Sequence, residues 1–144
     1  MAEQISFISA LSTKVVYVIF DKVRGKRHFW NIIARGDFAH CYCILPCSDT
    51  SCIFVHPLAG SFDIDLWQVS AEEAINLLHG RYFKILKATV KVNANRYYPR
   101  GIITCVSIIK YYLGLKFFCI TPRGLYKKLK KKGAIEMGEG YGKR

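Results

Sequence analysis

The sequence contains no apolar run that reaches the about 18 residues that a helix needs to cross a bilayer. Its first residues also lack the basic segment, followed by an apolar core, that marks a secretory signal. We therefore expect no signal peptide and no membrane span. The default compartment for such a chain is a reducing one, in which its six cysteines remain free thiols.

Motifs for several enzyme classes are absent. The chain has no phosphate-binding glycine loop, no dinucleotide fingerprint and no HExxH motif, so catalysis on those plans is unsupported. Four cysteines lie close together, at Cys41, Cys43, Cys47 and Cys52. Their C-x-C-x3-C-x4-C spacing differs from the two paired hooks of zinc knuckles and ribbons. A zinc site is thus the weaker interpretation, and we predict neither a metal nor an organic cofactor.

Acidic residues are scarce: 10 Asp and Glu face 22 Lys and Arg, which gives a net charge of +12. Half of this excess lies after residue 122, where eight basic residues accompany two acidic ones. The candidate anion-binding residues there are Lys127, Lys128, Lys130, Lys131 and Lys132. A basic surface attracts nucleic acid, anionic lipid or acidic cell-wall polymers, but such a run is also typical of a solvated helix face.

The length of 144 residues and the 51% hydrophobic content are typical of one globular domain. We place this domain at residues 1–133 and a basic, glycine-rich tail at 134–144. Segments rich in β-branched and aromatic residues predict strands at 14–20, 38–45, 52–55, 62–66 and 82–92. We expect Pro46 and Pro57 to end the second and third of these strands.

Three segments predict helices. Ser70 and Glu73 have the spacing of a capping box, so a short helix should follow them. Thr104 precedes an apolar helical pattern over 105–113, and Thr121-Pro122 is a helix start for 122–132. The expected fold is α+β: an antiparallel sheet of about five strands with two or three helices, the 105–113 helix packed on one face.

Cys105 is the main candidate for chemistry, because it opens a predicted helix. Backbone N–H groups and the helix dipole stabilise a thiolate at that position. His40 lies on a predicted strand, and a histidine beside a thiol can act as its general base. By strand alternation, we expect the His40 ring on the same face as Phe38 and Tyr42. The alternatives are a buried structural cysteine and a histidine bonded to backbone.

A third polar group could orient the His40 ring. His56 ends the strand that should pair with the His40 strand, so it is the first candidate for this role. Asp63 and Asp65, in the following segment, are alternative orienting groups. The alternative for His56 is an ordinary turn residue before proline.

The order of these parts, with the histidine strand first and the cysteine helix last, resembles the circularly permuted branch of the NlpC-type papain-like hydrolases. That branch includes the lecithin retinol acyltransferase-like proteins. The chain is also similar to small phage proteins with a running pattern over residues 28–130. Its pieces here are Trp30, the GDFAHC run at 36–41, VHP at 55–57, TCV at 104–106, LG at 113–114 and TPRGLY at 121–126.

The resemblance implies a permuted papain-like fold with Cys105 as nucleophile, His40 as base and His56 as orienting group. It implies thiol-dependent cleavage of an amide or ester, with the peptides of the cell wall (peptidoglycan), cut by a phage enzyme, as the best-fitting substrate. The implied location is the virion or the host cytoplasm. A second hypothesis is a non-enzymatic virion component that retains the fold and contacts other virion proteins. A third, argued from charge alone, is a basic nucleic-acid-binding protein.

Overall fold

The structure is a computed structural model that describes residues 13–22, 38–58, 61–78, 83–91 and 104–138. Within these ranges the chain forms a six-stranded antiparallel sheet and three helices, so the predicted α+β class is confirmed. Trp30, Gly36 and the predicted loop at 93–101 lie outside the described residues. Among the helices that are described, none is long and apolar enough to cross a membrane.

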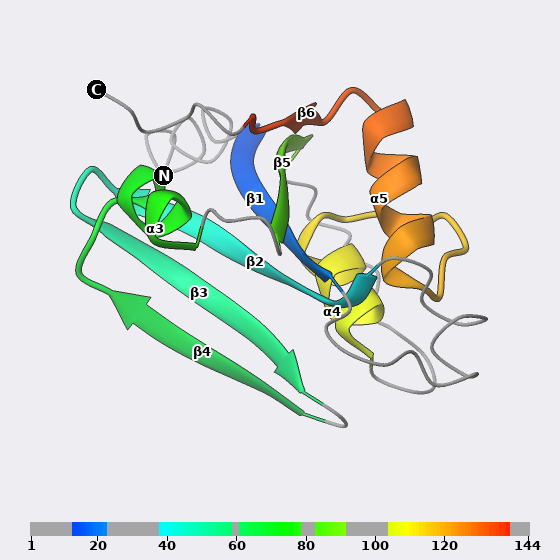
Figure 1. Cartoon of the computed structure of the whole chain (residues 1–144), viewed down its shortest axis with the longest axis horizontal. Coiled ribbons are helices and arrows are strands. Elements are labelled where there is room, and N and C mark those ends of the chain that lie inside the picture. Colours follow the sequence, from blue (N-terminus) through cyan, green and yellow to red (C-terminus); the bar gives the residue numbers. More distant parts are fainter. Residues whose placement is uncertain (1–12, 23–37, 59–60, 79–82, 92–103, 139–144) are drawn as a thin grey trace, which may run out of the picture.

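The strands are arranged in the order β4-β3-β2-β1-β5-β6 (Figure 1). They are β1 (Thr13–Lys22), β2 (Phe38–Ser48), β3 (Ser51–Leu58), β4 (Ser61–Trp67), β5 (Phe83–Lys91) and β6 (Ile135–Glu136). The helices are α3 (Ala71–Leu78), α4 (Cys105–Tyr112) and α5 (Pro122–Lys131). Each of the five segments predicted as a strand and each of the three predicted helices is present.

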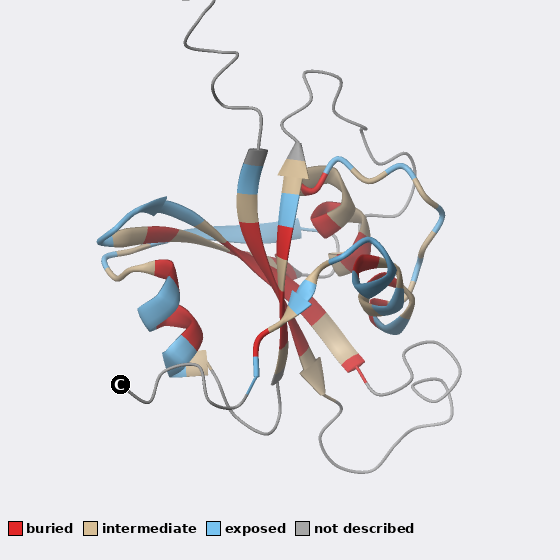
Figure 2. Ribbon diagram, turned by 90° about the horizontal axis from the view of Figure 1, so that it is seen from above, coloured by how far each residue is buried: buried red, intermediate tan, exposed pale blue. Residues whose placement is uncertain are grey.

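The helices lie on both sides of the sheet, and β1 shows why. Val16, Val18 and Phe20 of this strand pack with residues of α4 and α5, on what we call the helix-pair face. Tyr17 and Ile19 point the other way and pack with residues of α3, on the α3 face. Figure 2 shows α3 on one side of the sheet and the other two helices opposite it, with buried residues between the layers. The apolar run of β1 is continuous because both of its faces are buried.

Side chains that the sequence singled out cap the helices. Ser70 and Glu73 form the predicted capping box before α3, with N–H···O distances of 2.9 and 3.1 Å. The Thr121 hydroxyl accepts a hydrogen bond from the Gly124 N–H at 3.1 Å, and Pro122 follows as the first residue of α5. These caps satisfy N–H groups that have no partner inside the helix.

Two strand ends differ from the prediction. β2 continues through Pro46 to Ser48, and β3 continues through Pro57 to Leu58. Pro46 borders an irregularity in the pairing, and Pro57 is next to the end of its strand. One missing backbone donor is tolerated at such positions, so the prolines do not stop the strands.

The segment predicted as the start of a tail is partly folded. After α5, Gly133 has a φ of 92°, which turns the chain back toward the sheet. Ile135–Glu136 then pairs with β5 as strand β6, and Met137 is buried on the α3 face. Residues 134–137 therefore belong to the domain, and the predicted boundary after residue 133 is corrected.

Candidate active site

The candidate site lies where two neighbouring strands separate. The ladder between β2 and β3 ends at the pair Cys43–Val55. Beyond it, β2 remains paired with β1 as far as Phe38, and β3 remains paired with β4 as far as Leu58. Figure 1 shows the two ribbons diverging toward the end of the sheet at which α4 lies. We call this opening the β2–β3 fork, and through it groups from both faces of the sheet can meet.

Cys105 is the first residue of α4 and is half-buried. Thr104 caps the helix: its hydroxyl accepts from the Ser107 N–H at 3.2 Å, and its own N–H donates to the Ser107 hydroxyl at 2.7 Å. The first backbone bond of the helix runs from Ile108 N–H to the Thr104 carbonyl. The N–H of Cys105 precedes that bond and has no partner within the helix, so it is available for an oxyanion.

The Cys105 sulfur is held as a thiolate by two residues of β2. The thiol of Cys41 donates a hydrogen bond to it, and the Cys41 backbone N–H and the His40 side chain also favour its charged form. Partial burial opposes these interactions, yet together they lower the pKa of Cys105 from 9.0 to about 4. Cys105 is therefore ionised at neutral pH.

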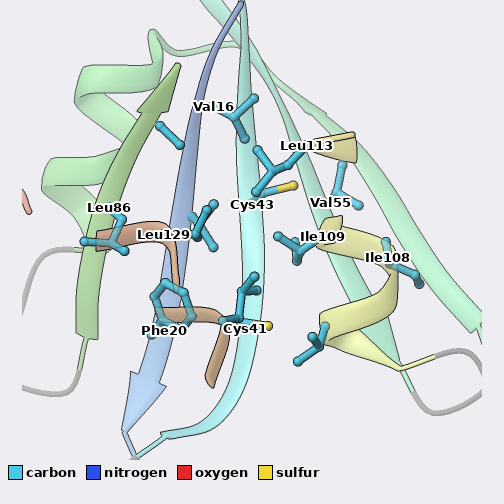
Figure 3. Close-up of a cluster of buried hydrophobic side chains, with 14 of the residues drawn as sticks. Val16, Phe20, Cys41, Cys43, Val55, Leu86, Ile108, Ile109, Leu113 and Leu129 are labelled. Carbon is cyan, nitrogen blue, oxygen red and sulfur yellow. The ribbon is translucent and has the colours of Figure 1, made fainter. Parts of the chain in front are cut away.

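Cys41 is the functional residue that the sequence analysis missed. It is fully buried, and burial, followed by its hydrogen bond to Cys105, raises its pKa well above 9.0. It therefore keeps its proton and remains a donor. Figure 3 shows the Cys41 sulfur directed toward α4 from the helix-pair face. Two signals in the sequence could have found this contact: strand alternation puts Cys41 on the face opposite the His40 ring, and the Cys105 helix is predicted to pack on one sheet face.

His40 comes next to Cys41 on β2, at a point where the strand is irregular. Asp21 of β1 pairs with His40, but the next residue, Lys22, pairs with Phe38, so Ala39 is an extra residue. As a result Phe38 packs on the helix-pair face, which corrects the prediction that it shares the His40 face. Nε2 of His40 is buried and has no aligned hydrogen bond to any described residue. Catalytic hydrogen bonds are often poorly aligned before substrate binds.

His56 of β3 faces His40 across the fork. Their ring centroids are 5.3 Å apart with an interplanar angle of 75°. Tyr42 lies against both rings, at 6.0 Å from His40 and 5.6 Å from His56. The neighbour of His56 on β4 is Asp63, whereas Asp65 lies opposite Phe54. The register thus places Asp63, and not Asp65, beside His56.

The structure therefore brings together the three residues for which a catalytic role is predicted: Cys105, His40 and His56. The other clustered cysteines do not converge. Cys43 is on the helix-pair face, Cys52 is on the α3 face and Cys47 is exposed. Within the described ranges, no group of three or more His, Cys, Asp or Glu side chains is arranged to hold a metal ion.

The predicted anion-binding lysines of α5 have different surroundings in the structure. The five candidates are Lys127, Lys128, Lys130, Lys131 and Lys132. Lys130 is paired with Glu136 of β6 at 3.4 Å, and Lys84 of β5 contacts the same carboxylate at 2.8 Å. The charge of Lys130 is thus neutralised by an ion pair inside the domain.

Other lysines gather around one aromatic ring. The amino groups of Lys128 and Lys132 lie 4.7 and 5.8 Å from the ring centroid of Phe117, and that of Lys110, from α4, lies at 5.8 Å. Cation–π contact stabilises each amino group there. Three like charges around one ring also create a strongly positive spot on the surface.

Searches of the chain against protein-family models, curated proteins and solved structures found no match. The assignment of a function consequently depends on the geometry of the site.

Proposed function

We propose that the protein is a thiol hydrolase that cleaves an amide or ester bond through a covalent intermediate on Cys105. The supporting observation is the environment of this one sulfur. It lies at the start of a helix, it receives hydrogen bonds from Cys41, and an imidazole is beside it. A thiolate with a pKa of about 4 and a neighbouring histidine are the groups that such chemistry needs.

In the acylation step, the Cys105 thiolate attacks the substrate carbonyl carbon and forms a C–S bond. The backbone N–H of Cys105 stabilises the oxyanion. Protonated His40 then gives its proton to the leaving amine or alcohol as the original bond breaks. In the second step, neutral His40 takes a proton from water, the resulting hydroxide attacks the thioester, and the thiolate is released. His56 holds the His40 ring in position, and Cys41 keeps its own proton throughout.

Among amide substrates we propose the peptides of peptidoglycan, which a phage cell-wall peptidase would cleave. The resemblance to NlpC-type hydrolases implies this class. A net charge of +12 also favours association with an anionic wall polymer.

The test is selective alkylation. With iodoacetamide at about pH 6, between the pKa of Cys105 and the ordinary value of a thiol, Cys105 should react faster than the other five cysteines. Peptide mapping by mass spectrometry gives the rate at each site. Slow and uniform labelling of all six would contradict the proposal and favour a non-enzymatic virion component.

A second measurement addresses catalysis itself. p-Nitrophenyl acetate should give a burst of one equivalent of nitrophenolate, with the acetyl group found on Cys105. Cys105→Ser should lose the burst while it keeps the fold, as monitored by circular dichroism. His40→Ala should slow acyl transfer and deacylation. If Cys105→Ser gave a burst as large as that of the wild-type protein, another residue would be the one acylated.

Binding of a polyanion is the second candidate function, and the positive spot around Phe117 favours it. If Lys110, Lys128 and Lys132 bind phosphates, the affinity for any DNA should fall steeply as salt is raised. Replacing all three lysines by Gln should weaken binding and flatten that salt dependence. Unchanged binding in the triple variant would move the DNA site elsewhere.

A further inference from the structure

β4 is an edge strand with two unlike faces. Phe62, Ile64 and Leu66 are 47%, 52% and 60% exposed. Their partners on β3 include Val55, so the three side chains lie on the helix-pair face of the sheet. No described helix makes more than minor contact with β4. Three apolar side chains in a row on an uncovered face mark an interaction surface.

The other face of β4 is acidic. Asp63 and Asp65 alternate with the apolar side chains and are exposed. They lie opposite His56 and Phe54, on the α3 face. The chain as a whole has a charge of +12, so this pair of carboxylates is a local exception to its charge.

The outer edge of β4 has no strand beside it among the described residues, and Figure 1 shows it as the outermost strand of the sheet. Its backbone N–H and C=O groups on that side can accept an added strand. β4 has seven residues, which allows a segment of about 20 Å to pair with it.

A second copy of this chain is a poor occupant. Pairing of β4 with another β4 over its full length puts Asp63 and Asp65 of one copy against the same two residues of the other. Like charges across a strand pair are destabilising. Two chains of charge +12 also repel each other.

We propose that β4 binds an extended segment of another protein, in which apolar side chains alternate with lysine or arginine. The segment would add a strand to the sheet. Its apolar side chains would cover Phe62, Ile64 and Leu66, and its basic side chains would lie beside Asp63 and Asp65. Asp63 is the β4 neighbour of His56, so one residue of this surface borders the candidate site. Peptide binding is measured without any hydrolysis, so the outcome of the binding test is independent of the proposed hydrolase.

The test uses two labelled seven-residue peptides, one alternating Lys with Val and the other alternating Glu with Val. At physiological salt, fluorescence anisotropy should show that the Lys peptide binds the wild-type protein at least about 10-fold more tightly than it binds an Asp63→Lys/Asp65→Lys variant. The same variant should gain affinity for the Glu peptide. Asp49→Lys/Glu72→Lys is the matched control: it changes the net charge equally at exposed positions outside β4, and it should leave Lys-peptide binding unchanged.

Two further measurements separate strand addition from other modes of binding. A Lys peptide that is N-methylated at alternate residues cannot donate to the edge, and it should lose binding. Ile64→Lys should weaken the unmodified peptide by about 10-fold, with its fold checked by circular dichroism. Equal binding of the methylated peptide, equal loss in the control variant, or a dimer of the free protein in sedimentation would each overturn the proposal.

Discussion

Replacing Cys41 should change the acidity of a different residue. The Cys41 thiol is the largest contributor to the depressed pKa of Cys105. A hydrogen bond to a charged group stabilises it by about 1.5–3 kcal/mol, and each pH unit corresponds to about 1.4 kcal/mol. Cys41→Ala should therefore raise the pKa of Cys105 by about 1–2 pH units. Cys41→Ser keeps a donor at this position and should leave the pKa low.

The assay is the rate of alkylation of Cys105 as a function of pH, followed by peptide mapping. The midpoint of the rate profile gives the pKa of this thiol in each variant. Cys43→Ala is the matched control, because Cys43 is equally buried on the same face of β2 but does not interact with Cys105. It should lose stability from a small cavity without any change in the midpoint.

The alkylation midpoints of the three variants together show which interaction lowers the pKa of Cys105. A midpoint that stays near pH 4 in Cys41→Ala would mean that His40 or the helix end alone holds the thiolate. Equal upward shifts in Cys41→Ala, Cys41→Ser and Cys43→Ala would mean that core packing sets the pKa, and the hydrogen bond would have no special role.

Three other predictions concern stability. Folding lowers the pKa of Cys105, so the ionised thiolate stabilises the fold at high pH, and this stabilisation disappears as the pH falls to about 4. Between pH 4 and pH 9 the free energy of unfolding in urea, compared with that of Cys105→Ser, should rise by up to about 1.4 kcal/mol per pH unit. The hydrogen bond from Lys84 is the largest of several that lower the pKa of Glu136 to about 2. Glu136→Gln should therefore lower the stability by about 1 kcal/mol at neutral pH, and thermal unfolding should show this loss disappearing as the pH approaches 2. Gly133→Ala forces a side chain onto a φ of 92° and should cost about 1–2 kcal/mol, whereas Gly138→Ala, with open space and no positive φ, should leave the Tm nearly unchanged.

The sheet and its helices could be predicted because their signals are local. The apolar run of β1, the capping pairs and Thr121-Pro122 each act within a few residues, and the structure has the corresponding elements. The proximity of Cys105 to His40 was predicted only through the resemblance and the order of the parts. It depends on a long-range packing of α4 that no local pattern encodes.

The remaining features of the site depend on strand register. The extra residue at Ala39 moves Phe38 to the opposite face, and it leaves no mark in the composition of β2. The end of the β2–β3 ladder at Val55 opens the fork, and the pairing of His56 with Asp63 selects one of two aspartates. Register is fixed by the whole set of neighbouring strands, so a single sequence does not reveal these details.

The fork joins groups that belong to different layers of the molecule. The sulfur comes from a helix on one side of the sheet, while the imidazole of His56 lies among the aromatic side chains of the other side. The groups that lower the pKa of Cys105 belong to β2, so an acidic thiol at position 105 exists only after α4 has packed on that strand. Its alkylation rate at mildly acidic pH would report this packing, since a collapsed chain without it would contain six ordinary cysteines.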